Sequence, residues 1–141
     1  MGARNPPDGE PCLNTYLLDT TVLIGHLRGL EEITQFILDL ITEGHAVGTS
    51  CVNIAELHHG ARPKERKDVQ ALVDRLEFLE TTADASARAG KYQARLRGEG
   101  VTLHTADALV AGTARANGAI LVTDNEADFP MRDLRVVRPL R

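Results

Sequence analysis

The sequence of 141 residues contains little cysteine, no tryptophan and no long apolar run. Its two cysteines, Cys12 and Cys51, form no C-x-x-C pair, so neither a zinc knuckle nor a disulfide framework is predicted. The apolar stretches, such as residues 119–122, are far shorter than the roughly 18 residues that a membrane-spanning helix requires. The opening residues also lack the apolar segment of a secretory signal. We therefore expect a cytoplasmic protein that does not cross a membrane.

The sequence also lacks an excess of positive charge. Its formal net charge is −4, so any affinity for nucleic acid has to come from local basic patches. The content of 43% apolar, 26% charged and only 4% aromatic residues is typical of a globular protein. At this length we expect a single domain, residues 15–141, which follows a flexible lead-in of residues 1–14.

Short apolar runs alternate along the chain with segments of helical periodicity, and this alternation predicts an α/β domain with a largely parallel sheet. Strands are expected at residues 16–18, 46–48, 119–122 and 135–137. Helices are expected at residues 30–41, 50–59, 63–79, 84–97 and 105–117. Either Thr49 or Ser50 is expected to cap the second of these helices.

Two aspartates lie at positions that the sequence pattern predicts to be buried. Asp19 directly follows the first predicted strand, at the strand end where open α/β sheets bind ligands, although it would also serve as a helix N-cap. Asp107 lies in a helix that is apolar or small on every side, and such a helix is normally buried. A buried carboxylate costs several kcal/mol unless it is compensated, which is more than the helix dipole supplies. Both residues are therefore candidate functional acids.

Other acids come from two further segments. Glu56 lies one turn after Asn53 on the same helix face, where a simple exposed glutamate is the alternative. A strand is followed by Asp124, Glu126 and Asp128, where the alternative is a solvated acidic turn. Like charges repel, so a cluster of acids from four segments requires a cation. Carboxylates without accompanying histidine or cysteine favour Mg²⁺ or Mn²⁺ over zinc.

Basic residues and histidines offer contacts for phosphate. One basic row consists of Arg88, Lys91 and Arg95, and a second cluster consists of Arg62, Lys64, Arg66 and Lys67. Each group is either a solvated flank or a contact for an RNA backbone. His104, just before a predicted helix, is a further candidate phosphate contact. His58 and His59 are adjacent on a helix and diverge by about 100°, so they do not both ligate one ion.

Four segments together resemble the PIN-domain ribonucleases, and most closely the VapC toxins of bacterial toxin–antitoxin pairs. The segments are residues 17–24 (LLDTTVLI), 53–57 (NIAEL), 107–114 (DALVAGTA) and 121–129 (LVTDNEADF), and the resemblance runs from about Tyr16 to Pro139. It implies a parallel five-stranded sheet flanked by helices, with acids around Mg²⁺ or Mn²⁺ at the carboxyl ends of the strands.

The resemblance also assigns roles to individual residues. It places Asp19, Glu56 and Asp107 on the first three acidic positions of the family. At the fourth position it favours Asp128, and Asp124 is the rival ligand. The supporting polar residues are Thr20, which follows the first aspartate, and Asn125, which matches the last motif.

The implied function is that of a toxin, an endoribonuclease that hydrolyses structured RNA (tRNA or rRNA) by metal-activated water. The expected products carry a 5′-phosphate and a 3′-hydroxyl. The implied partners are a cognate antitoxin and a second copy of the chain. On helix 30–41, Leu38 widens the apolar arc beyond one core contact, so part of this surface is expected to remain exposed for the antitoxin.

Two alternatives stay open at this point. Asp19 followed by Thr-Thr-Val resembles the nucleophile loop of a haloacid-dehalogenase-type phosphatase, but Thr21 stands where that family has a second aspartate. The other alternative is a catalytically silent PIN-like module that binds RNA or protein. A nuclease assay separates both from the ribonuclease, because the phosphatase attacks small phosphate esters and the module cleaves nothing.

Overall fold

The computed structural model describes residues 12–139, and five parallel strands within them form one sheet in the order β3-β2-β1-β4-β5. The strands are β1 (Thr15–Leu18), β2 (Ala46–Ser50), β3 (Glu77–Leu79), β4 (Ile120–Val122) and β5 (Val136–Val137). The chain passes outward from β1 to β3 and then returns to place β4 on the other side of β1. The strand order therefore reverses between β1 and β4, where α/β proteins bind ligands. The predicted fold class is confirmed.

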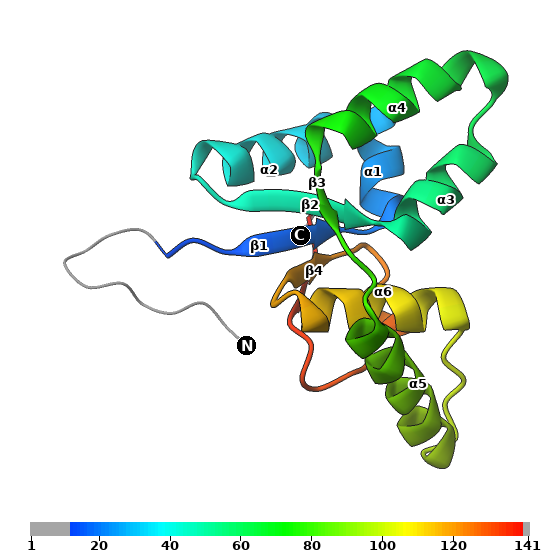
Figure 1. Ribbon diagram of the computed structural model, residues 1–141. Coiled ribbons are helices and arrows are strands. Elements are labelled where there is room, and N and C mark those ends of the chain that lie inside the picture. The colour runs from blue at the N-terminus through cyan, green and yellow to red at the C-terminus, as the bar shows by residue number, and fades with distance from the viewer. Residues whose placement is uncertain (1–11, 140–141) are drawn as a thin grey trace.

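Helices cover both faces of this sheet. They are α1 (Thr20–Leu27), α2 (Glu31–Thr42), α3 (Cys51–Gly60), α4 (Arg66–Arg75), α5 (Ala83–Gly98) and α6 (Thr105–Ala116), with short 3-10 turns at Pro63–Glu65 and Glu126–Asp128. Figure 1 shows α1, α2 and α4 on one side of the sheet and the α5–α6 pair on the other. The sheet is thus the middle of three layers.

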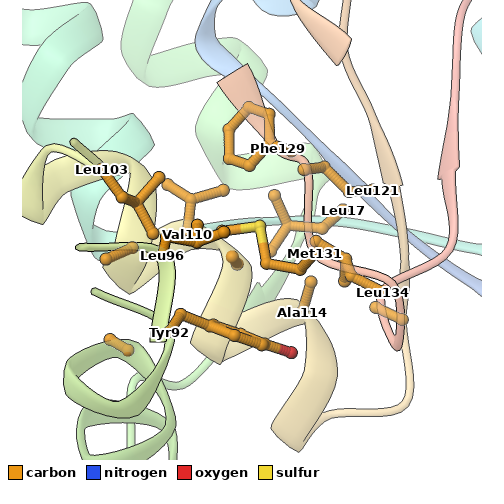
Figure 2. Close-up of a cluster of buried hydrophobic side chains, with 14 of the residues drawn as sticks. Leu17, Tyr92, Leu96, Leu103, Val110, Ala114, Leu121, Phe129, Met131 and Leu134 are labelled. Carbon is orange, nitrogen blue, oxygen red and sulfur yellow. The ribbon is translucent and has the colours of Figure 1, made fainter. Parts of the chain in front are cut away.

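Adjacent residues of the central strands supply two separate cores, because successive strand side chains point to opposite faces. Leu17 and Leu121 contribute to the core beneath α5 and α6, whose side chains are shown in Figure 2. Leu18 and Val122 contribute to the core beneath α1, α2, α3 and α4. Strands β1 and β4 are therefore covered on both faces, which holds the loops that follow them in fixed positions.

The prediction of one helix from residue 63 to residue 79 is wrong. Helix α4 ends at Arg75, the backbone of Leu76 is extended, and Glu77–Leu79 forms strand β3 beside β2. The partner residue Gly48 makes this pairing possible, because a Cβ there would lie 2.7 Å from the Glu77 carbonyl oxygen. Leu79 is buried as the helical spacing suggested, but it is buried as part of a strand.

The structure also changes one predicted boundary and decides between two predicted caps. Residues 1–11 of the predicted lead-in lie outside the described residues. The Asn14 N–H donates to His45 Nδ1 at 3.0 Å and its carbonyl accepts from the Ala46 N–H at 3.0 Å, so Asn14 belongs to the packed structure. Ser50 rather than Thr49 caps α3, because its hydroxyl accepts from the Asn53 N–H.

Candidate active site

Asp19 stands at the point where the strand order reverses. Its backbone N–H donates to the Val122 carbonyl at 2.9 Å, which joins the end of β1 to the end of β4. It occupies the N-cap position of α1, but its side chain makes no capping hydrogen bond. Instead, Oδ2 accepts from the Thr123 hydroxyl at 2.7 Å and Oδ1 accepts from the Asn53 amide at 3.1 Å. The carboxylate is thus held between two loops.

Burial makes the charge of Asp19 costly. The residue is only 7% exposed, and desolvation raises the pKa of its carboxyl group. The hydrogen bonds from Thr123 and Asn53 favour the ionised form and oppose this rise, whereas the negative charge of Glu56 adds to it. The backbone N–H of Thr20 is a third hydrogen-bond donor to this carboxylate, and it also favours the ionised form.

A chain of hydrogen bonds connects Asp19 to Glu56 through one buried amide. Asn53 is 0% exposed, and its Nδ2 donates both to Asp19 and to Thr20 Oγ1, the latter at 3.0 Å. The Thr20 hydroxyl then donates to Glu56 Oε1 at 2.6 Å. On the far side, Asn53 Oδ1 accepts from the Ser50 hydroxyl at 2.6 Å. Both N–H groups and the oxygen of the Asn53 amide therefore have hydrogen-bond partners. Because Thr20 continues the chain to Glu56, these bonds fix how the two acids are oriented relative to each other.

These side chains open onto a cleft of about 510 Å³ at the carboxyl edge of the sheet. The lining residues are Asp19, Thr20, Thr21, Ala55, Glu56, His59, Asp107 and Asn125. Three of the four acids that the sequence suggested, from three separate segments, therefore face one space.

Asp107 lies in the first turn of α6 and is half-buried. Desolvation raises the pKa of its carboxyl group, and the charges of Asp19, Asp128 and Glu56 raise it further, while His104 lowers it. The four acids that the resemblance selected thus act on one another electrostatically. His104, at the N-cap of α6, is one of the residues predicted to contact phosphate, and its effect on the pKa of Asp107 places it near these acids.

The segment after β4 contains both rivals for the fourth acidic position. Asn125 lines the cleft, and its N–H donates to the Thr123 hydroxyl at 3.0 Å. Asp128 ends the following 3-10 turn and is exposed, and its charge contributes to the raised pKa of Asp107. Asp124 is half-buried, and neither it nor Asp128 is among the described residues that line the cleft. The effect of the Asp128 charge on Asp107 supports Asp128 as the fourth acid, and its role as a ligand stays a prediction.

The side chains that line the cleft supply the type of ligand atom that a divalent cation binds. Carboxylate oxygens and the Asn125 amide are the ligands that Mg²⁺ and Mn²⁺ prefer. Burial raises the pKa of Asp107, and the negative charges of the neighbouring acids add to this rise. Within residues 12–139, no three His, Cys, Asp or Glu side chains already form a compact group able to hold a metal. A bound ion would therefore have to draw these side chains toward itself.

Most of the predicted RNA contacts lie away from the cleft. The exposed Arg62 and Lys64 follow α3, and none of the five predicted Arg and Lys contacts is among the described residues that line the cleft. On α5, Arg88 pairs with Asp84 at 2.8 Å, Arg95 lies over the Tyr92 ring and Lys91 is exposed. The chain folds without bringing these basic groups to the acids, so their contact with RNA stays a prediction.

Sequence reasoning missed three residues of the site. His59 lines the cleft because it follows Glu56 by three residues on the same face of α3, a spacing that the sequence already displays. Thr123 and Asn53 hold Asp19 from positions 104 and 34 residues away in the chain. Only the assembled sheet reveals these two contacts.

The family comparison agrees with this geometry. The family model described as "PIN domain" matches residues 16–133. The chain is 33% identical to ribonuclease VapC10 of Mycobacterium tuberculosis over 115 residues, which cover 82% of this chain and 86% of that protein. It is 31% identical to the tRNA(fMet)-specific endonuclease VapC of Shigella flexneri, with 81% and 89% of the two chains covered.

A solved structure shares the fold. The toxin–antitoxin assembly VapBC2 from Rickettsia felis, bound to a DNA fragment from its promoter, contains a chain that superposes with a TM-score of 0.79 at 24% identity. The superposition covers 88% of this chain and 98% of that chain. The protein therefore belongs to the PIN-domain family and, within it, to the VapC-type ribonucleases. No helix among residues 12–139 is long and apolar enough to span a membrane.

Proposed function

We propose that this VapC-type ribonuclease is the toxin of a toxin–antitoxin pair and cleaves structured RNA in the cytoplasm with Mg²⁺ or Mn²⁺. The observation that supports this most is the cleft in which Asp19, Glu56 and Asp107 face one another. The name of the Shigella flexneri relative favours tRNA as the substrate class, with rRNA as the other structured RNA.

The ion would be held by Asp19, Asp107 and Asp128, with Asp124 as the alternative to Asp128. When bound, a divalent ion lowers the pKa of water and supplies positive charge to the scissile phosphate. The protein's own part is to fix the acids: Asn53 and Thr123 orient Asp19, and the Thr20 hydroxyl orients Glu56. Glu56 is exposed to the cleft and accepts the proton of the attacking water.

Hydrolysis then needs no side-chain nucleophile. The water oxygen attacks phosphorus and gives one proton to Glu56 as the bond from phosphorus to the 3′-oxygen breaks. The leaving 3′-oxygen takes up one proton from solvent, and Glu56 then releases its proton to solvent. The 5′-side fragment keeps a 3′-hydroxyl, and the downstream fragment carries a 5′-phosphate. His104, Arg62, Lys64, Arg88, Lys91 and Arg95 are the proposed contacts for the RNA backbone, which would make binding weaken with added salt.

The exposed apolar surface of α2 fits a protein partner. Leu38 is 49% exposed and Ile41 is 53% exposed, so the prediction that part of this helix stays uncovered is confirmed. A groove of about 210 Å³ lies between α1, α3 and α4, and its lining combines apolar side chains with the charged Arg28, Glu56, Glu65 and Asp68. We propose that the antitoxin's tail occupies these surfaces, since the related structure is a VapBC assembly. We also propose that the chain forms a homodimer, as the resemblance to the VapC toxins implies.

The experiment is a cleavage assay on a purified total tRNA fraction. The chain is first treated with excess chelator, and Mg²⁺ or Mn²⁺ is then added back. We expect no cleavage in chelator, recovery with either ion, and new ends that carry 5′-phosphate and 3′-hydroxyl groups. Undiminished cleavage in chelator would refute metal dependence. Metal-replete protein that leaves tRNA and rRNA intact would favour the silent binding module.

A further inference from the structure

A pocket of about 290 Å³ lies at the edge of the sheet opposite the catalytic cleft. Its walls come from the end of α6, the beginning of β4 and the loop before β5, and are formed by Arg115, Gly118, Ala119, Ile120, Arg132, Asp133, Leu134 and Arg135. Asp107 and Arg115 stand near opposite ends of α6, about 12 Å apart along its axis at 1.5 Å per residue. The pocket is therefore separate from the acidic site.

The pocket is locally positive although the whole chain has a net charge of −4. Three arginines line it, and Asp133 is its single acid. The Asp133 carboxylate already accepts from the Tyr92 hydroxyl at 2.9 Å and lies 3.6 Å from Arg115 Nε. That second distance makes an ion pair but is too long for a hydrogen bond, so the buried Arg115 Nε has no hydrogen-bond partner within residues 12–139.

The other two guanidinium groups are presented by a well-anchored loop. Arg132 and Arg135 are exposed, and within the described residues neither forms an ion pair. Their neighbours Met131 and Leu134 are buried in the core under α6, and Figure 2 shows both side chains within that cluster. The Arg135 carbonyl also accepts from the Leu121 N–H at 3.0 Å. Because the backbone is fixed, little loop entropy opposes the binding of a ligand.

We propose that Arg115, Arg132 and Arg135 form a binding site for a phosphate group. The guanidinium fork matches phosphate oxygens in geometry and charge, and the pocket has an excess of positive groups over its one engaged carboxylate. The phosphate belongs either to a small free phosphate compound or to the backbone of an RNA. Both sources share the same recognition chemistry, and the experiment separates them.

The test measures binding of inorganic phosphate by titration calorimetry at low ionic strength, in the presence of chelator. Three proteins are compared: the wild type, Arg132→Gln/Arg135→Gln, and the control Arg75→Gln/Arg97→Gln, whose exposed arginines on α4 and α5 lie outside the pocket. Both double variants lower the net charge equally. We expect saturable binding in wild type and control, and a Kd at least about tenfold weaker in Arg132→Gln/Arg135→Gln.

A second titration with a short single-stranded RNA, again in chelator, identifies the source of the phosphate. If the pocket variant also weakens RNA binding at least about tenfold relative to the control, the site takes backbone phosphates. If RNA binding is equal in the three proteins while inorganic phosphate binding is lost, the site takes a small phosphate compound. Equal phosphate affinity in all three proteins, or no saturable binding by the wild type, overturns the proposal.

Discussion

Asn53 Nδ2 donates a hydrogen bond to Asp19 Oδ1 across 3.1 Å, and both side chains are buried. The amide places the positive end of a neutral dipole against a carboxylate whose pKa is raised by burial. A cationic side chain at this position would compensate the same charge but would compete with a bound metal ion. The neutral amide therefore favours the ionised form of Asp19 without adding positive charge to the cleft.

Replacing Asn53 by aspartate should be strongly destabilising. The Asn53→Asp change removes both hydrogen-bond donors of the amide and adds a second buried negative charge beside Asp19. An uncompensated buried charge costs roughly 3–5 kcal/mol, so the free energy of unfolding in chelator at pH 7 should fall by about that amount. Urea denaturation measures it.

The matched control is Gln35→Glu. Gln35 also donates from a side-chain amide to an aspartate, Asp39 Oδ1 at 2.7 Å, but this pair is exposed on α2. The same change of chemistry there should cost at most about 0.5 kcal/mol. If the two variants lose similar amounts of stability, the buried hydrogen bond from Asn53 does not offset the cost of the Asp19 charge.

Neutralising Asp107 should relieve repulsion in the metal-free protein. Burial and neighbouring acids raise its pKa, so between the unfolded value of about 3.9 and the raised folded value the native state binds the extra proton. Stability of the wild type in chelator therefore falls as the pH rises through this interval and stays lower above it. Asp107→Asn lacks this loss, and we expect it to be at least as stable as the wild type at pH 7.

Millimolar Mg²⁺ should reverse that order. An ion that binds only the native state stabilises it by roughly 2.7 kcal/mol at a hundredfold excess over Kd, and the variant lacks one of the proposed ligands. Thermal melts of both proteins with and without the ion measure the difference. A variant clearly weaker than the wild type in chelator would mean that Asp107 is a structural hydrogen-bond partner instead.

The packing of α5 on α6 predicts opposite effects for two glycines. A Cβ on Gly112 of α6 would lie 2.3 Å from the Ala85 carbonyl oxygen, which is backbone of α5, whereas a Cβ on Gly90 of α5 would meet nothing within 4 Å. Gly112→Ala should lower the free energy of unfolding by about 1–3 kcal/mol. Gly90→Ala should raise it by up to about 1 kcal/mol, since alanine favours a helix interior.

Chemical denaturation of the two glycine variants measures both changes in the free energy of unfolding. The α5–α6 contact forms one wall of the core shown in Figure 2, so loss of stability in Gly112→Ala reports on that core. Equal stability of Gly112→Ala and the wild type would contradict the close approach of the two helices.

The exposed surface of α2 leads to a prediction about the proposed antitoxin. Leu38→Glu places a charge on an apolar surface that is 49% exposed, so it should weaken antitoxin binding at least about tenfold without unfolding the chain. Val101→Glu is the control, because Val101 is also exposed but follows α5 on the other side of the sheet. Binding of the co-purified antitoxin is measured by calorimetry. Unchanged affinity in Leu38→Glu would show that this surface is not part of the interface.

Much of the fold could be predicted because β1 and β4 are buried on both faces and read as continuous apolar runs. Strand β3 could not, since Glu77 and Phe78 are exposed and its position depends on the pairing with Gly48 of β2. The apolar residues Leu76 and Leu79 continue the helical spacing of the apolar residues in α4, so the sequence pattern predicts a longer helix. Tertiary pairing thus overrides a local periodicity that is correct only as far as Arg75.

The acids of the site were predictable for a different reason. Asp19 and Asp107 stand out because charged residues in apolar segments are costly, and this cost is visible in a single sequence. The residues that orient them are ordinary polar residues whose importance depends on distant neighbours. Asn53 and Thr123 acquire their role only when β1, β4 and α3 come together at one edge of the sheet.

Metal-dependent RNA cleavage by four single variants tests the proposed catalytic centre most directly. The variants are Asp19→Asn, Asp107→Asn, Asp128→Asn and Asp124→Asn, each assayed with Mn²⁺ on the same tRNA and checked for a folded circular dichroism spectrum. We predict that the first three lose at least about a hundredfold in cleavage rate, whereas Asp124→Asn keeps the rate within about threefold of the wild type. Wild-type cleavage by folded Asp19→Asn and Asp107→Asn would contradict the assignment of this cleft as the active site.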